Sequence, residues 1–376
     1  MKGVIYLDYQ ATTPLAPEVH AAMEPWLREH FANPHSAHRL GRAAAAAVEV
    51  ARSRVGALMP EGGRLIFTSG ATEALNIAIQ GAARRARRAD PRRVRVLTVE
   101  TEHSAVRDTV LALGEDGFEP ELLPVGPEGL LDPATVEVAL DDRVALLAVM
   151  LVNNEIGVIQ PVEQLAGLAR KAGALFLCDA VQGFGRVELP RSADMIAISG
   201  HKIYGPKGIG ALWLREGLDL PPLLHGGGQE LGLRPGTLSP ALCVGLGEAA
   251  RLMGERARED AAHVEALWRH LRDGLRGWTL NGSEAARYHG NLNLRREGLD
   301  AARLLSDCRS VALSLGSACA SGSGRPSHVL RALGLSDREA RSSIRLGFGR
   351  YTTLAEIDAA THKIVEAAEA QALPSG

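Results

Sequence analysis

The sequence predicts an α/β protein built on a mostly parallel β-sheet with helices on both faces. From about residue 64 to residue 214, short apolar runs alternate with longer amphipathic ones, as in strands and helices that follow one another along the chain. The apolar runs are nearly continuous in Val, Ile and Leu, which is typical of strands buried on both faces. Seven predicted strands result, over residues 64–68, 94–99, 121–125, 144–152, 174–178, 195–198 and 210–214.

Helices are expected between several of these strands, where apolar residues recur at helical spacing. Open sheets of this kind bind ligands beyond the carboxyl ends of their strands, so polar side chains at those ends are the first candidates for a site. The predicted helices cover residues 72–88, 105–113, 133–140 and 162–172.

The last third of the chain has a different pattern, which predicts a second, smaller α/β domain. A long helical stretch covers residues 240–275, and a second helical pattern covers residues 357–370. We interpret residues 14–256 as the large domain and residues 257–376 as the small one. Residues 1–13 are expected to join the small domain.

Composition excludes several classes of function. The 376 residues are 46% hydrophobic and 23% charged, with a formal net charge of −2, an ordinary balance that favours neither nucleic acid nor an acidic membrane surface as a partner. The arginine run at residues 84–95 fits a solvated helix end near the negative pole of the helix dipole. The longest apolar strand-like run, residues 144–152, is too short to cross a bilayer.

The cellular compartment is expected to be the cytoplasm. The first residues contain no apolar stretch long enough for a signal peptide. The four cysteines, at positions 178, 243, 308 and 319, form no C-x-x-C pair and no framework of a small secreted domain. A reducing compartment suits such free thiols.

One lysine stands out because lysine is rare in this chain. The sequence has five lysines among 42 Lys and Arg residues, and Lys202 follows the apolar run 195–198 inside a glycine-punctuated segment. Arginine stays protonated in proteins, whereas a lysine amine can deprotonate and form a Schiff base with an aldehyde. Lys202 is therefore a candidate nucleophile, although taken alone it could equally be an exposed loop lysine.

Further polar residues follow other predicted strands. The segment from Thr68 to Glu73 opens a helix, and the free N–H groups of such a turn can hold a phosphate. Asp179 follows the strand 174–178, where a buried carboxylate needs a cationic partner such as a protonated pyridine nitrogen. His103 follows the strand 94–99, and its imidazole could stack on a flat cofactor. Asn154 lies just beyond the strand 144–152.

These groups are the parts of a pyridoxal-phosphate site. Their order resembles the NifS/IscS-type cysteine desulfurases, a branch of the class-V aminotransferases within the fold-type-I pyridoxal-phosphate enzymes. The resemblance extends from residues 6–14 to residues 342–345 and so covers nearly the whole chain. The segments Ser-Gly-His-Lys-Ile-Tyr-Gly-Pro-Lys-Gly at 199–208 and Gly-Ser-Ala-Cys at 316–319 are specific motifs.

The resemblance implies a role for each matching residue. Lys202 would form the Schiff base with the cofactor and shuttle the Cα proton of the substrate, His103 would lie against the ring, and Asp179 would hold the ring nitrogen. The cofactor phosphate would be bound by Ala71, Thr72, Ser199 and His201, and the region of the phenolic oxygen by Asn154 and Gln182. The substrate carboxylate would be bound by Asn33 and Arg345. Thr237 would reach the phosphate of the neighbouring subunit, which implies a homodimer.

Cys319 decides the reaction that the resemblance implies. It lies in a Gly- and Ser-rich segment, a composition that predicts a mobile loop. A thiol there could attack the substrate sulfur and carry it away as a persulfide. The chain is expected to convert L-cysteine to L-alanine and to pass the sulfur to an iron–sulfur scaffold or to a relay for tRNA thiolation. Cys178, Cys243 and Cys308 are expected to be small buried hydrophobes.

Some alternatives remain open at this point. A selenocysteine lyase or another class-V aminotransferase would share most of these residues, and only Cys319 argues against the aminotransferase. A nucleotide-binding loop around Gly200 and Lys207 lacks the Gly-Lys-Ser/Thr order. A metal site at His35 and His38 lacks further ligands placed by the sequence, so we predict no metal. Departures from the family pattern occur at Gln10, Leu315 and residues 238–239.

Overall fold

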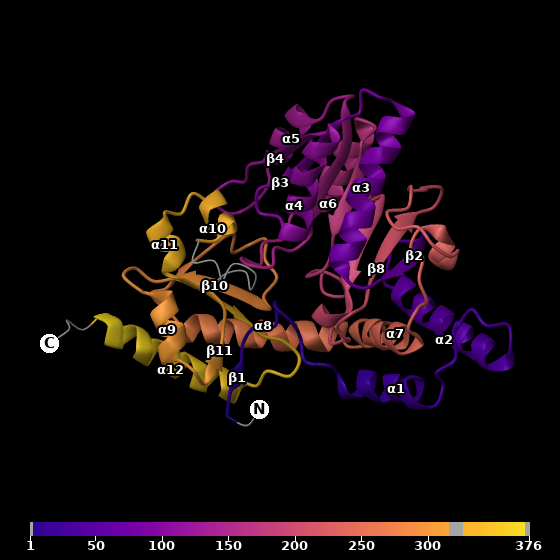
Figure 1. Ribbon diagram of the computed structural model, residues 1–376. Helices are drawn as coiled ribbons and strands as arrows, with labels where there is room; N and C mark the ends of the chain where they lie inside the picture. Colours follow the sequence, from indigo (N-terminus) through magenta and orange to yellow (C-terminus); the bar gives the residue numbers. More distant parts are fainter. Residues whose placement is uncertain (1–2, 316–325, 373–376) are drawn as a thin grey trace.

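The computed structural model describes residues 3–315 and 326–372. Its centre is a seven-stranded sheet in which one strand runs opposite to the other six (Figure 1). This confirms the predicted mostly parallel sheet. In spatial order the sheet contains β2 (Gly63–Thr68), β8 (Gly210–Arg215), β7 (Met195–Ser199), β6 (Leu175–Asp179), β5 (Val144–Met150), β3 (Arg95–Val99) and β4 (Glu119–Leu123), of which β8 is the reversed strand.

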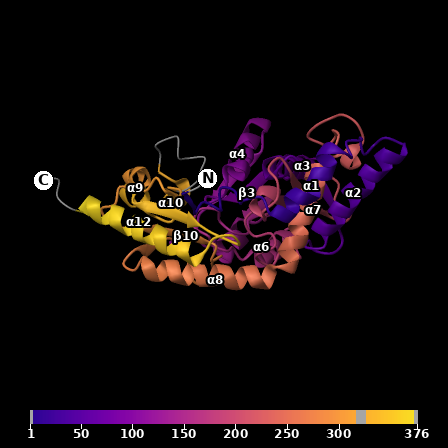
Figure 2. The ribbon, with the colours of Figure 1, turned by 90° about the horizontal axis from the view of Figure 1, so that it is seen from below.

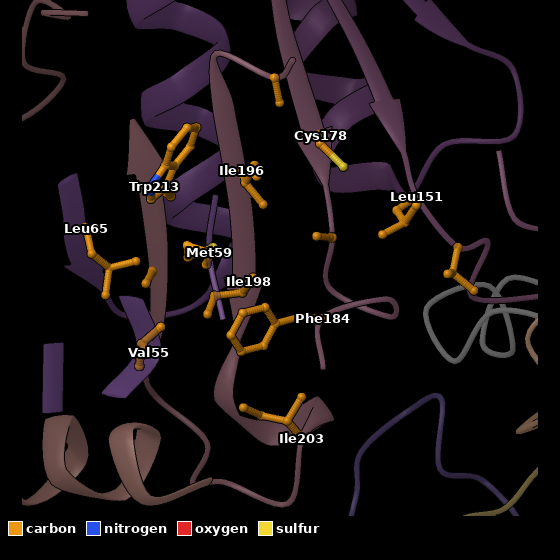
Figure 3. Close-up of a cluster of buried hydrophobic side chains, with 14 of the residues drawn as sticks. Val55, Met59, Leu65, Leu151, Cys178, Phe184, Ile196, Ile198, Ile203 and Trp213 are labelled. Atoms are coloured by element: carbon orange, nitrogen blue, oxygen red, sulfur yellow. The ribbon is translucent and has the colours of Figure 1, made fainter. Parts of the chain in front are cut away.

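Helices cover both faces of this sheet, because each face carries buried apolar side chains that need a partner. On one face, α3 (Ala71–Ala89) and α4 (Ser104–Ala112) pack against apolar residues of the strands. The other face is covered by α1 (Pro17–Arg28), α2 (Arg39–Gly56), α5 (Pro133–Ala139), α6 (Val162–Lys171) and α7 (Pro240–Glu255). Figure 3 shows part of this second core, in which Cys178 lies among Ile196, Phe184 and Leu151.

Two predicted strands end two residues away from the predicted position, whereas the other five differ by no more than one residue at either end. The strand expected at 121–125 is β4 at Glu119–Leu123, because Pro124 has no N–H to donate to a further ladder bond. The strand expected at 144–152 ends at Met150. There the Asn153 side chain accepts hydrogen bonds from the N–H groups of Glu155 and Ile156, which closes a tight turn and ends the extended backbone.

The helical stretch expected at 240–275 is divided into two helices. The first is α7, and the second is α8 (Ala257–Gly274). Arg256 lies between them with φ −100° and ψ 6°, outside the helical region. The apolar residues of α7 belong to the core of the large sheet, whereas those of α8 belong to a different core. The break therefore lies where the chain passes from one core to the other.

That other core is built around a three-stranded antiparallel sheet. In spatial order this sheet contains β12 (Ser343–Gly347), β10 (Asn291–Arg295) and β9 (Thr279–Leu280). Apolar residues of α8, α9 (Ala301–Asp307) and α12 (Leu354–Ala372) pack on it, and Figure 2 shows α8 and α12 side by side. Leu7 and Cys308 also belong to this core. The remaining elements are β1 (Ile5–Tyr6), β11 (Val311–Ala312), α10 (His328–Ala332), α11 (Asp337–Arg341) and the short 3-10 helices η1 (Leu113–Asp116), η2 (Gly200–Lys202) and η3 (Gln229–Gly232).

The N-terminal segment connects the two cores. β1 pairs in parallel with β11, and the Gly347 N–H donates to the Leu7 carbonyl at 2.8 Å. Farther along, the Thr13 N–H donates to the His201 carbonyl at 2.9 Å, beside the large sheet. Residues 8–13 therefore lie between β12 and the end of β7. No helix within 3–315 and 326–372 is long and apolar enough to cross a membrane.

Candidate active site

The predicted site residues converge on a cavity of about 550 Å³ at the carboxyl ends of β5, β6 and β7. Such a volume is typical of a small-molecule site. Two predicted residues, Asn33 and Thr237, do not line the cavity and are exposed. Cys319 is outside the described residues. Ten predicted residues line it: Ala71, Thr72, His103, Asn154, Asp179, Gln182, Ser199, His201, Lys202 and Arg345.

Lys202 reaches the cavity from η2, directly after β7. Its Nζ donates hydrogen bonds to the carbonyl oxygens of Gln10 at 2.5 Å and Ala11 at 2.8 Å. Burial, and after it the nearby Arg345 guanidinium, lower the pKa of Lys202 to about 8, because both disfavour the ammonium form. About a tenth of this amine is therefore unprotonated at pH 7, far more than for an ordinary lysine, and the free amine is the form that acts as a nucleophile or base.

The turn that follows Lys202 has an unusual backbone. Tyr204 has φ 64°, a left-handed conformation that is rare for a bulky residue. Its N–H donates to Thr13 Oγ1 at 2.7 Å, and its hydroxyl accepts the N–H of Arg350 at 2.9 Å. The Arg350 guanidinium also lies over the Tyr204 ring, at 4.3 Å from the centroid. These contacts hold the strained turn and so fix the position of Lys202.

Asp179 is the last residue of β6 and is 5% exposed. Its Oδ1 accepts the N–H of Val181 at 3.0 Å. Burial raises the pKa of Asp179 to about 6, whereas the Val181 N–H and the Lys202 charge act in the opposite direction. A buried carboxylate with a raised pKa is stabilised by a cation placed beside it. Asp179 can therefore hold a protonated ring nitrogen.

A second buried carboxyl group, which the sequence analysis did not select, lies behind Asp179. Glu102 is fully buried, and its Oε1 accepts the N–H of Met150 at 2.8 Å. Its Oε2 has no hydrogen-bond partner in the part of the chain that the structure describes. Burial, and then the charge of Asp179, raise the pKa of Glu102 well above its ordinary value. Burial and the nearby Asp179 charge therefore both favour the protonated form of the Glu102 carboxyl group.

His103 caps the N-terminus of α4. Its Nδ1 accepts the N–H of Ala105 at 3.1 Å, so in the neutral ring the proton is on Nε2. Burial and the charges of Lys202 and His328 lower the pKa of His103. The site therefore presents a neutral, flat imidazole, which suits a position against an aromatic ring better than the role of a cation.

The N-terminus of α3 opens into the same cavity. Gly70 precedes the helix, and no side chain within the described ranges caps this end. The N–H groups of the first turn thus remain free for an acceptor, and the helix dipole favours a negative one. Ser199 and His201 approach from β7 and η2. His201 Nδ1 lies 3.2 Å from Thr12 Oγ1. These groups form a cradle for a phosphate.

Arg345 lines the opposite part of the site from β12 and is 1% exposed. Its Nη2 donates to Asp8 Oδ1 at 2.7 Å, and its Nη1 donates to the Asn154 carbonyl at 3.0 Å. Its buried Nε has no partner within residues 3–315 and 326–372. A substrate carboxylate would meet an arginine that is already oriented, with one donor still available.

Pyridoxal phosphate fits this set of donors. The uncapped start of α3 can take the phosphate, Lys202 can take the aldehyde and Asp179 the ring nitrogen. Two buried polar atoms of cavity residues, Gln10 Oε1 and Arg345 Nε, have no partner among the described residues and are available to a bound molecule. The metal alternative gains no such support, because His38 instead accepts the Gly41 N–H at the start of α2. The described ranges contain no group of three His, Cys, Asp or Glu residues suited to a metal.

The segment 200–207 also differs from a nucleotide-binding loop. A Walker loop leads into a helix, whereas Lys207 leads into strand β8. No sequence pattern marked Glu102, because a carboxyl group in a loop carries no periodic pattern, and Asp8 lies inside the matched segment 6–14 without an assigned role. Gln10 and Lys207 lie inside motifs that were recognised, and they too line the cavity.

Comparisons with known proteins identify the family of this chain. The family model described as "Aminotransferase class-V" matches residues 5–360. A "Cysteine desulfurase IscS" of Rickettsia rickettsii (strain Iowa) is 42% identical over 371 residues, which cover 96% of this chain and 90% of the relative. Another from Rickettsia bellii (strain OSU 85-389) is 43% identical with the same coverage.

Solved structures of similar proteins have the same fold as this chain. A "NIFS-LIKE PROTEIN" has a TM-score of 0.89 and 31% identity, and the match covers 96% of this chain and 98% of that one. "SspA in complex with cysteine" has a TM-score of 0.83 and 36% identity, with 93% and 99% covered. The chain therefore belongs to the class-V aminotransferase family, in the branch of the NifS- and IscS-type cysteine desulfurases.

Proposed function

We propose that this chain is a pyridoxal-phosphate-dependent cysteine desulfurase that converts L-cysteine to L-alanine. The observation that carries the proposal is the position of the Lys202 amine, in one cavity with Asp179 and Arg345. The sulfur atom leaves the Cβ of cysteine and is inserted into the thiol of Cys319, which becomes a persulfide. The substrate carbon regains a proton and becomes alanine, so the atoms balance without an added oxidant or reductant.

Each residue has a defined task in this reaction. The bound cofactor withdraws electrons from the Cα of the amino acid. Asp179 keeps a proton at the ring nitrogen, which maintains that withdrawal. Lys202 Nζ takes the Cα proton and returns one to the product. Arg345 binds the substrate carboxylate, and the Cys319 thiolate attacks the sulfur.

The partners follow from the same proposal. The persulfide would pass to an iron–sulfur scaffold or a sulfur-relay protein in the cytoplasm. Thr237 would contact the phosphate of a second subunit in a homodimer, which agrees with its exposed position away from the cavity of its own chain. Asn33, which is also exposed, would help to bind the carboxylate only if its loop is brought to a site by substrate or by the second subunit.

We also propose the division into domains at residue 256. The large domain would comprise residues 14–256, and the small domain residues 257–376 with residues 1–13. Support comes from the separate cores of α7 and α8 on either side of Arg256. The pairing of β1 with β11 supports the assignment of the N-terminal residues.

The test is Cys319→Ser in the full-length holoenzyme. Serine is a far weaker nucleophile toward sulfur, so the variant should bind the cofactor but lose multiple turnover to alanine. Mass spectrometry of the wild-type enzyme with cysteine should find an increase of about 32 Da on the peptide that contains Cys319. Cys308→Ala is the matched control, because Cys308 is 4% exposed in the core on β10 and β12.

Full turnover by Cys319→Ser, or a persulfide on another cysteine, would contradict the proposal. Parallel assays with selenocysteine distinguish a desulfurase from the alternative, a selenocysteine lyase. A desulfurase requires Cys319 to release alanine from cysteine. A selenocysteine lyase would act on selenocysteine and release little alanine from cysteine.

A further inference from the structure

Lys207 lies beside the phosphate cradle. It precedes Gly208 and strand β8, and both residues line the cavity together with Ser69 and Gly70. The antiparallel register pairs Gly210 with Thr68. A Cβ on Gly210 would lie only 2.7 Å from the carbonyl carbon of Gly70. The start of β8, just after Lys207, is therefore packed closely against the residue that precedes α3.

The other basic groups of the cavity are already engaged or neutral. Lys202 donates to two backbone carbonyls, and Arg345 is paired with Asp8. Burial, with the charges of Lys202 and Lys207, lowers the pKa of His201 to about 4, so this imidazole is uncharged at neutral pH. The pKa of His103 is also lowered.

Lys207 differs from all of them. It is exposed, and within residues 3–315 and 326–372 it has no recorded hydrogen bond or ion pair. No acidic residue of the described chain neutralises it. The cavity thus holds an unpaired positive charge at the end where α3 begins.

A phosphate monoester has a charge of about −1.5 to −2 near neutral pH. The cradle offers backbone N–H groups, hydroxyls and an uncharged imidazole, all of which donate hydrogen bonds without a full positive charge. We propose that Lys207 binds the 5′-phosphate of the cofactor and supplies the charge that the cradle lacks. This inference rests on pyridoxal phosphate as the cofactor of the proposed function.

The experiment compares two ligands that differ only in the phosphate. Apoenzyme of the wild type and of Lys207→Ala is titrated with pyridoxal phosphate and, separately, with pyridoxal, and each Kd is measured by protein fluorescence. Loss of a charge-assisted contact should raise the Kd for pyridoxal phosphate about tenfold, which is the lower end for such bonds because Lys207 is exposed to water. The Kd for pyridoxal should change less than about twofold, since this contact is absent from it.

Two further variants make the result specific. Lys207→Arg keeps the charge and should retain most of the affinity for pyridoxal phosphate. Lys171→Ala is the matched control, because Lys171 is an exposed lysine at the end of α6, outside the cavity. It should leave both Kd values unchanged. Added salt should weaken pyridoxal phosphate binding more in the wild type than in Lys207→Ala.

Equal weakening of both ligands by Lys207→Ala would show that Lys207 only supports the turn, and the proposal would be wrong. An unchanged Kd for pyridoxal phosphate would also overturn it, even with normal alanine production by the wild type. Failure of the wild-type apoenzyme to bind pyridoxal phosphate would instead refute the cofactor assignment itself. If Lys207→Ala does not fold, as judged by circular dichroism, Lys207→Gln provides the same comparison with a similar side-chain length.

Discussion

The strand ends and the exposed loops contribute to the proposed site in different ways. Lys202, Asp179 and Ser199 follow or end strands whose pairing in the sheet fixes their positions, and they meet in one cavity of a single chain. Asn33 and Thr237 lie on exposed segments outside that cavity. The strand ends thus bring their polar side chains together within one chain, whereas the two exposed segments add no side chain to this cavity.

The largest effect is expected for Lys202→Ala. Removal of the amine eliminates both the Schiff base and the proton transfer, and general acid–base catalysis alone contributes typically about 10²–10⁴-fold. Alanine production should fall by at least that factor. Steady-state alanine assays with Lys171→Ala as a control provide the measurement. A variant that keeps more than a tenth of the wild-type rate would contradict the assignment of Lys202 as the catalytic amine.

Asp179→Asn should have the next largest effect. The amide is similar in size but cannot retain the proton at the ring nitrogen, and loss of one electrostatic stabiliser typically costs about 10²–10³-fold in kcat. The fold should persist, because the Val181 N–H can still donate to the side-chain oxygen. Single-turnover kinetics measure the rate, and a thermal melt tests the fold. Near-normal turnover would contradict the role of Asp179.

Arg345→Ala and Asn33→Ala compare the two regions directly. Arg345 is an oriented, buried donor, so its loss should raise KM for cysteine about 10- to 100-fold. Removal of Arg345 also leaves the Asp8 carboxylate without its partner. The double variant Asp8→Asn with Arg345→Ala separates the cost of this unpaired carboxylate from the loss of substrate binding.

Asn33→Ala should change KM for cysteine by less than about tenfold, because it removes a single neutral hydrogen bond. If Asn33→Ala proved the more harmful variant, our contrast between strand ends and exposed loops would not hold.

Thr237→Val should have the smallest effect, a rise of about five- to tenfold in the Kd for pyridoxal phosphate. Mixed dimers test whether Thr237 acts across subunits. When Thr237→Val subunits pair with Lys202→Ala subunits, a contact in trans leaves one site with both Lys202 and Thr237 intact. That site should bind the cofactor with wild-type affinity. If its affinity stays reduced, Thr237 acts within its own chain.

The sheet was predictable because its signal is local. Buried strands such as residues 195–198 need apolar side chains on both faces, so the sequence itself marks them. Their ends depend on neighbours: β4 stops before Pro124, and β5 stops at the turn around Asn153. Neither α1 nor α2 was predicted. α2 is rich in Ala and Arg, α1 contains an internal proline, and the role of both appears only when they pack on α7.

The cavity was predictable where residues follow strands or match a family motif. Lys202 and Asp179 satisfy both conditions. Glu102 follows the strand 94–99 as His103 does but matches no motif, and its importance comes from burial behind Asp179, which no linear pattern encodes. Asp8 is similar, because its partner Arg345 is 337 residues away in the chain. The role of Cys319 remains a prediction from its motif, because this residue is outside the described ranges.

The position of residues 8–13 has a consequence for biosynthesis. Gln10, Ala11 and Thr12 line the cavity, yet the segment is held by Gly347 and by the bond from Asp8 to Arg345. Contacts of such long sequence separation form late, because loop closure costs entropy before it gives any energy. The ribosome must therefore translate the chain as far as β12 before residues 8–13 can complete the wall of the cavity. Nascent chains that end before β12 should therefore bind pyridoxal phosphate poorly.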